Sequence, residues 1–345
     1  MRRLLSAWLV AALPALAVAQ EPTGPAPELK QLEPLVGNWH GSGEATFAPG
    51  APPTKWAGNG TYAWVLGGHW LQEDFALEFD GLPTPMVKHA FLGWDRSGKR
   101  YVKATCGSNG EVALHELVRL GDGTFVEMTL QHRDGMPYAG RSTLRATKEG
   151  LVHTIDVWMA EGPMQAVTAA TFTRGGEPYA ADLATPAFLG EKPHASLTRL
   201  SRAAGDYATA GTVVPAPGEA TIQLAGVDSF RTAFGGMILL GESHGAPAGS
   251  PVGYEGRVLY GYDANADAIV GIYVGSAGEI MRIEARWLPD GRLLSTGSVT
   301  IDGSTKFERY LMEFDQKGGP TRAVGHTLMD GLPPFESYRA TYTRK

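Results

Sequence analysis

The stretch Leu66-Gly67-Gly68-His69-Trp70-Leu71 returns as Phe234-Gly235-Gly236-Met237-Ile238-Leu239, 168 residues later. The same spacing relates Gly37 to Gly205, Gly93-Trp94-Asp95 to Gly261-Tyr262-Asp263, and Gly110-Glu111 to Gly278-Glu279. The two segments also end alike, because Thr171-Phe172-Thr173-Arg174 returns as Thr341-Tyr342-Thr343-Arg344 after a small insertion. Similarity at a fixed period indicates a tandem duplication. The chain therefore contains two copies of one folding unit.

The segments between these glycines have the pattern of β-strands. From His69 to Phe79, apolar residues such as Leu71, Phe75 and Leu77 alternate with polar ones, which is typical of a half-buried strand. Asp-Gly and Asn-Gly pairs between such runs indicate tight turns. Only the lead-ins at 28–35 and 196–204 resemble short helices. The sequence predicts an all-β protein made of two tandem antiparallel β-barrels, each with a short helical lead-in.

The order of segments along the chain gives the expected domains. Arg2-Arg3, an apolar stretch and Ala17-Val18-Ala19 predict a signal peptide at 1–19. We expect a disordered N-terminus at 20–27, a first barrel at 28–174, a linker at 175–194 and a second barrel at 195–345. The linker assignment rests on Pro178, Pro186 and Pro193 and on the lack of a periodic pattern.

Composition narrows the classes of partner. The chain has 30 basic and 36 acidic residues, and removal of Arg2 and Arg3 with the signal makes it more acidic still. This charge disfavours nucleic acid as a partner. We expect an exported, periplasmic or extracellular protein that does not insert into the membrane after signal cleavage. The lone Cys106 cannot form an internal disulfide, and its counterpart Val274 predicts a small apolar strand residue.

A family resemblance rests on three motifs. They are Leu32-Glu33-Pro34-Leu35-Val36-Gly37-Asn38-Trp39-His40-Gly41-Ser42-Gly43, Leu66-Gly67-Gly68-His69-Trp70-Leu71 and Gly93-Trp94-Asp95. Together they resemble the bacterial domain of unknown function numbered fifteen-seventy-nine. The resemblance implies a calycin-like barrel, similar in shape to lipocalins and nitrobindins, and no established activity. It covers most of the first copy and, more weakly, the second.

Two strands supply the candidate ligand-binding residues. His69 and Glu73 share the parity of Leu71 and are expected to face the interior, whereas their counterparts are Met237 and Gly241. One hairpin later, the first copy places His115 and Arg119 where the second has Ile283 and Trp287. Because the second copy lacks these polar groups, the fold does not require them. We therefore expect a ligand site in the first barrel formed by His69, Glu73, His115 and Arg119.

These residues leave three hypotheses for the function. The leading one is an exported protein that binds a small apolar or amphipathic molecule in the first barrel, without catalysis. The second is an isomerase or hydrolase that uses His69 and Glu73 as an acid–base pair. The third is a scaffold that contacts other proteins. No motif predicts a metal site or a cofactor, with haem bound by a first-copy histidine as the one alternative. The sequence leaves the oligomeric state open.

Overall fold

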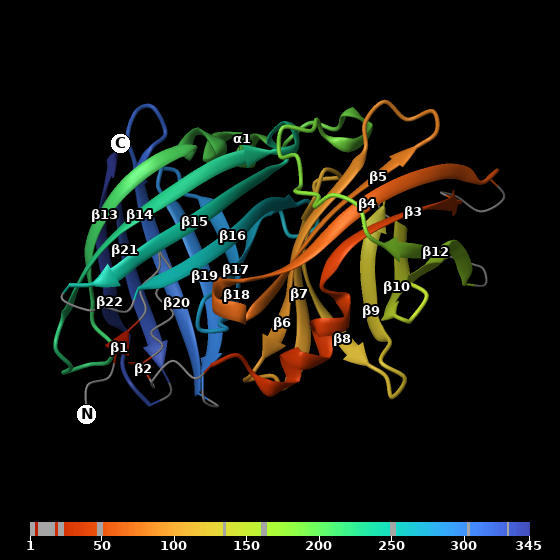
Figure 1. Ribbon diagram of the computed structural model, residues 1–345. Coiled ribbons are helices and arrows are strands. Elements are labelled where there is room, and N and C mark those ends of the chain that lie inside the picture. The colour runs from red at the N-terminus through yellow and green to blue at the C-terminus, as the bar shows by residue number, and fades with distance from the viewer. Residues whose placement is uncertain are drawn as a thin grey trace.

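The computed structural model describes residues 4–5, 18–19, 24–46, 51–133, 136–159, 164–248, 253–301, 304–329 and 331–345. Near the N-terminus, the two-residue strands β1 (Leu4–Leu5) and β2 (Val18–Ala19) pair with each other. Within these residues the remaining strands form two closed antiparallel barrels that follow one another along the chain (Figure 1). The predicted fold class is confirmed.

Ten strands of the described chain form the first barrel. They are β3 (Gly37–Ala45), β4 (Thr54–Val65), β5 (Trp70–Phe79), β6 (Met86–Asp95), β7 (Arg100–Gly107), β8 (Val112–Arg119), β9 (Phe125–Arg133), β10 (Met136–Ala146), β11 (Leu151–Met159) and β12 (Gln165–Arg174). Each strand pairs with its neighbour in sequence, and β12 closes the barrel against β3.

The described strands of the second barrel follow the same order. They are β13 (Gly205–Val213), β14 (Ile222–Ala233), β15 (Ile238–Pro247), β16 (Tyr254–Asp263), β17 (Ala268–Gly275), β18 (Ile280–Trp287), β19 (Leu293–Ile301), β20 (Ser304–Phe314), β21 (Pro320–Met329) and β22 (Phe335–Arg344). Here β22 closes against β13.

A helical lead-in packs on each barrel. The first is the 3-10 helix η1 (Pro27–Leu35), and the second is α1 (Ala195–Leu200) followed by η4 (Ser201–Ala203). η1 places Leu29, Leu32 and Leu35 in the core of the first barrel, because leucines three apart share one side of a short helix. Figure 1 shows η1 and α1 at opposite ends of their barrels.

Equivalent aromatic residues attach both lead-ins. The Trp39 indole donates a hydrogen bond to the Leu35 carbonyl at 2.8 Å, and the Tyr207 hydroxyl donates to the Ala203 carbonyl at 2.9 Å. The guanidinium groups of Arg174 and Arg344 stack over these two rings. The residues kept aromatic in both copies therefore fix the lead-in to the barrel.

The repeated Gly-Gly pair forms a left-handed turn. In η2 (Leu66–Gly68), Gly67 and Gly68 have φ of 67° and 83°, and in η5 (Phe234–Gly236), Gly235 and Gly236 have φ of 65° and 89°. Glycine adopts such angles without the steric cost that a Cβ would add. The pair is repeated because both copies need this turn before their third strand.

The two barrels pack through a shared apolar core. The outer faces of β5–β7 and β15–β17 form one cluster of buried residues that includes Trp70, Phe91, Cys106, Leu259 and Val274. β7 and β17 are therefore buried on both faces from their second residue on. Cys106 is the buried apolar strand residue that we predict, and burial raises the pKa of its thiol.

Contacts across this interface are reciprocal. The His69 ring lies against Gly278, and the Met237 methyl group lies against Gly110. Since residues 69 and 237 are counterparts, and 110 and 278 are too, each barrel uses the same surface. This is the property of an isologous, twofold-symmetric interface. The tandem chain thus resembles a dimer whose two subunits are joined by a linker.

The linker residues lie along this interface. Tyr179, Ala181 and Leu183 pack on the shared core, and the short helix η3 (Phe188–Gly190) follows. The Phe188 amide donates a hydrogen bond to the Ser108 carbonyl at 2.7 Å. Its ring packs near Phe79 at one end of the first barrel.

Candidate functional site

Charged side chains converge inside the first barrel. Glu73 on β5, Lys103 on β7, His115 on β8 and Glu127 on β9 alternate with outward-facing residues and share the inner face with core residues such as Leu71 and Tyr101. All four are buried. Together with Glu111, we call them the interior charged cluster.

Lys103 lies at the centre of the cluster. Its Nζ is 2.9 Å from Glu73 Oε2 and 3.9 Å from Glu127 Oε2. His115 links the other carboxylates, because its Nε2 is 3.5 Å from both Glu111 Oε1 and Glu127 Oε1. Four strands and the β7–β8 turn therefore contribute to one network.

Electrostatics keep the central pair ionised. Burial alone would raise the pKa of Glu73, but the nearby Lys103 charge lowers it below the ordinary range. Burial would lower the pKa of Lys103, but Glu73 and Glu127 raise it above its usual value. Each charge is stable inside the barrel only because the opposite charge is beside it.

The edge of the cluster is also charged. Burial opposes ionisation of Glu111, yet the hydrogen bond with His115 and the Lys88 charge lower the Glu111 pKa to about 2. Lys88, on β6, influences Glu73 and Glu127 in the same direction. Among the described residues, Lys88 forms no ion pair.

A histidine on β11 completes the polar interior. His153 Nε2 lies 2.9 Å from the Ser142 hydroxyl. Burial and the charge of Lys103 lower the His153 pKa to about 4, so this ring is neutral at pH 7. It can therefore accept or donate a hydrogen bond without adding charge.

The Thr105 hydroxyl group on β7 has no hydrogen-bond partner in the described chain, and it is fully buried. Buried polar groups normally pair. This hydroxyl group could therefore form a hydrogen bond with a bound molecule that reaches it.

Solvent reaches part of this interior. Several inward-facing residues are half-buried rather than buried, namely Phe75, Leu77, Lys88, Ser142, His153, Ile155 and Thr168. Phe75 packs edge-on against Phe172 at 5.0 Å between ring centroids, so the accessible space has an aromatic wall. Apolar and charged surfaces meet in the same space.

The second barrel fills the equivalent space with tyrosine rings. Tyr260, Tyr273, Tyr310 and Tyr338 are all fully buried there. Glycines make room for these rings. A Cβ on Gly256 would lie 2.5 Å from the ring of Tyr273, and a Cβ on Gly271 would lie 2.5 Å from the ring of Tyr260. Gly256 and Gly271 are the counterparts of Lys88 and Lys103. The lysine charges at these two positions are thus particular to the first copy.

The structure places the four predicted site residues in three locations. Glu73 and His115 lie in the interior charged cluster. His69 lies at the interface between the barrels. Its Nδ1 is so close to Gly278 that a Cβ added to that glycine would lie only 3.0 Å away. Burial and the Arg96 charge lower its pKa to about 4.

A backbone detail explains the position of His69. It has φ of −82° and ψ of −20°, which is a helical conformation at the end of η2. The alternation of a strand begins only at Trp70, so parity with Leu71 does not determine where the His69 ring points. The structure therefore does not form a His69–Glu73 pair.

Arg119 lies apart from the cluster. It ends β8, is exposed, and lies four residues from His115, or roughly 13 Å along an extended strand. The structure therefore brings two of the four predicted residues together.

Sequence reasoning missed Lys88, Lys103, Glu111, Glu127 and His153. The sequence does indicate Lys88 and Lys103, because the second copy has glycine at both equivalent positions. It does not indicate Glu111, since Glu279 stands opposite it. For Lys103, the mixed polar and apolar composition of β7 hid the inward direction.

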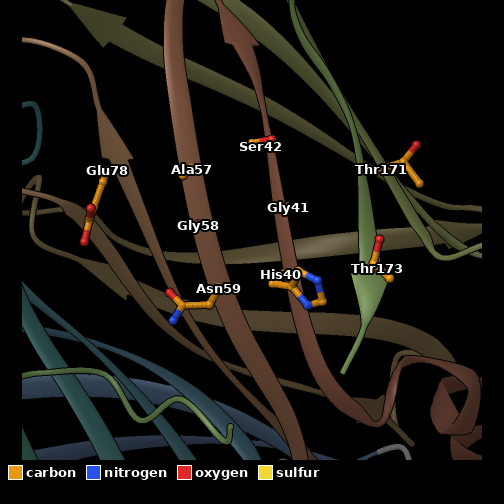
Figure 2. A pocket seen from close by; sticks show the side chains of 9 residues that line it. All are labelled: His40, Gly41, Ser42, Ala57, Gly58, Asn59, Glu78, Thr171 and Thr173. Atoms are coloured by element: carbon orange, nitrogen blue, oxygen red, sulfur yellow. The ribbon is translucent and has the colours of Figure 1, made fainter. Parts of the chain in front are cut away.

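A second hollow lies on the outer surface of the first barrel. It is a groove of about 560 Å³ over β12, β3, β4 and β5. Figure 2 shows the residues that line it, which are His40, Gly41, Ser42, Ala57, Gly58, Asn59, Glu78, Thr171 and Thr173. None of their side-chain atoms is both buried and unpartnered in the described structure. The interior is the stronger candidate site.

Two further features are absent from the described residues. No group of three or more His, Cys, Asp and Glu side chains is arranged to hold a metal ion. No helix in this part of the chain is long and apolar enough to cross a membrane.

Comparison with known proteins confirms the family resemblance over most of the first barrel. Residues 24–144 match the family described as "Protein of unknown function (DUF1579)". No curated protein matches the chain significantly. A crystal structure of a protein of unknown function from the DUF3598 family of Nostoc punctiforme is similar at 11% identity and a TM-score of 0.27. That match covers 93% of this chain and 100% of the other, and at this TM-score it supports no inference.

Proposed function

We propose that this chain, whose first barrel matches a family of unknown function, binds a small amphipathic molecule inside that barrel. The observation that carries the proposal is the interior charged cluster in a space that solvent partly reaches. The cluster would hold the polar end of the ligand. The apolar part would lie against Phe75, Leu77 and Phe172.

Energetics support a functional reason for the cluster. Buried ion pairs seldom stabilise a fold more than apolar residues of similar size would, because each charge loses its hydration. The second barrel shows that this fold can fill the same positions with Gly241, Gly271, Ile283 and Ser295. Charges that stability does not require are consistent with a binding role.

The ligand size follows from the barrel. A small closed barrel has an interior wide enough for side chains or for one small ligand. In the second barrel tyrosine rings occupy that volume, so the proposed ligand of the first barrel would have a comparable bulk. The second barrel would then serve to cover the outer face of β5–β7.

The test introduces residues of the tyrosine-filled second interior at the equivalent positions of the first barrel. The double variant Lys88→Gly with Thr105→Tyr reproduces the Gly256–Tyr273 pair of the second barrel. We expect the wild-type protein to bind the neutral fluorescent probe N-phenyl-1-naphthylamine and the variant to lose at least about tenfold in affinity. Circular dichroism checks that the variant is folded.

A control separates the interior from the outer groove. The variant His40→Ala with Asn59→Ala alters only the groove and should bind the probe like the wild type. Undiminished affinity in a folded Lys88→Gly, Thr105→Tyr protein, or lost affinity in the groove variant, would show that the interior is not the site.

A further inference from the structure

The wall of the first barrel is barely paired between β8 and β9. Only Leu117–Glu127, Val118–Val126 and Arg119–Phe125 are in register within the described residues. The equivalent strands β18 and β19 are paired at six positions. Their pairing extends as far as Ile283–Gly297 and Arg282–Ser298. Residues 112–116 of β8 and 128–133 of β9 thus border an unpaired segment, which we call the seam.

One residue difference coincides with the seam. Gly297 lets β18 and β19 approach closely, since a Cβ there would lie 2.7 Å from Met281 Sδ and 3.0 Å from the Arg282 carbonyl oxygen. The counterpart of Gly297 is Thr129, which carries a branched Cβ. A Cβ at this position would push the neighbouring backbone away, which disfavours pairing as close as that of β18 with β19.

The inner side of the seam opens on the interior charged cluster. His115 on β8 and Glu127 on β9 lie on either side of it, 3.5 Å apart. His115 is nine-tenths buried, and its Nε2 is 3.5 Å from both Glu111 Oε1 and Glu127 Oε1. The polar end of a molecule in the seam would therefore meet a ring nitrogen that lies between two carboxylates.

The outer side of the seam is apolar on β9. Met128 and Leu130 are 57% and 76% exposed there. Their counterparts Thr296 and Ser298 in the paired second barrel are polar. Exposed apolar side chains favour contact with apolar molecules. The seam therefore combines an apolar entrance with a polar end point.

We propose that the seam is the ligand entrance of the first barrel, that Thr129 keeps it open, and that it admits small amphiphiles whose polar end reaches His115. This inference rests on the proposed function. It adds the route and the residues that control exchange between the interior and solvent.

The experiment compares the wild type with Thr129→Gly and Thr129→Ser. Glycine removes the Cβ and should let β8 and β9 pair as β18 and β19 do, whereas serine keeps the Cβ and is the matched control. In hydrogen exchange, peptides covering 112–117 and 127–130 should become protected in Thr129→Gly only. In stopped-flow binding of N-phenyl-1-naphthylamine, association and dissociation should both slow by about tenfold in that variant, with an unchanged equilibrium constant.

The outcomes separate the route from the site. Protection without slower exchange of the probe would show that molecules enter elsewhere, and would overturn the entrance while leaving the interior site intact. Unchanged protection in Thr129→Gly would overturn the role of Thr129. A wild-type protein that does not bind the probe would overturn the proposed function and the entrance together. The reverse variant Gly297→Thr should lose protection at 282–284, and full protection there would also contradict the role of the Cβ.

Discussion

Glu308 shows how a carboxyl group is kept inside the second barrel. It is 2% exposed, and the Tyr310 hydroxyl donates a hydrogen bond to its Oε2 at 2.5 Å. Burial raises the Glu308 pKa to about 8. Glu73 in the first barrel is equally enclosed, yet Lys103 keeps it ionised. Burial thus favours the neutral form of Glu308, whereas Glu73 stays ionised because Lys103 is beside it.

This contrast predicts a pH dependence of stability. Because the folded-state pKa of Glu308 is above the unfolded value of about 4.3, the folded protein holds a proton that the unfolded chain releases. The stabilisation is complete below about pH 4 and is lost as the pH rises to about 8, with a slope of up to about 1.4 kcal/mol per pH unit. Glu308→Gln should flatten the decline in the free energy of unfolding between pH 5 and pH 9, as measured with urea.

A surface glutamate provides the control for this prediction. Glu284 on β18 is exposed, and Glu284→Gln should leave the pH profile unchanged. Equal profiles for the wild type and Glu308→Gln would mean that Glu308 is ionised in the folded protein.

Single residues also show how far the sequence determines the site. Alternation places Glu73 and His115 on the inner face because both lie within regular strands. The same rule does not apply to His69, whose helical backbone precedes the strand. The ion pairs of Lys103 join strands that are distant in the sequence, and no local pattern indicates such contacts.

At the scale of elements, glycine positions decide which interior is filled. In the second barrel, Gly271 on β17 faces the ring of Tyr260, and the first copy has Lys103 and Leu92 at the two positions. Glycine in a strand normally weakens it, unless another group needs the space. Here a buried tyrosine ring takes that space.

Gly271→Ala is therefore expected to destabilise the second barrel. The new Cβ would lie 2.5 Å from a ring carbon of Tyr260, and overpacking of this kind costs about 1–3 kcal/mol. Thermal unfolding followed by circular dichroism measures the effect. Gly121→Ala is the matched control, because a Cβ there has no neighbour within 4 Å. Equal stability of the two variants would contradict close packing at Gly271.

The type of each element is easier to predict from the sequence than the pairing between neighbouring strands. Strand alternation, glycine turns and the leucine pattern of the lead-ins indicate local structure directly, and the predicted antiparallel barrels are confirmed. The weak pairing of β8 with β9 was not predictable, because both strands have ordinary strand composition. It depends on how close two backbones come, and it is evident only when the strand pairs of the two barrels are compared.

At the scale of the whole molecule, the duplication produces an interface as well as a second barrel. Leu114, on the outer face of β8, packs on the shared core, which accounts for an apolar residue outside the barrel. The repeated sequence indicates two similar units but not which faces meet. The reciprocal contacts of His69 and Met237 show that each copy uses the same face.

Trp70 is the residue that should reveal how strongly the barrels depend on each other. Its ring is fully buried in the shared core, and its indole donates a hydrogen bond to the Gly275 carbonyl of the second barrel at 2.8 Å. Trp70→Ala removes this bond and leaves a cavity, which costs about 3–5 kcal/mol for a buried tryptophan. Since the lost contacts join the two barrels, calorimetry should show one transition in the wild type and two in the variant.

The counterpart of Trp70 offers a graded control for this coupling. Ile238 occupies the equivalent place in the shared core without a side-chain hydrogen bond, so Ile238→Val removes one methyl group at a cost of about 0.5–1.5 kcal/mol. That variant should keep a single transition at a slightly lower temperature. If Trp70→Ala also keeps a single transition, the rest of the shared core and the linker contacts of Phe188 and Leu183 are enough to couple the barrels.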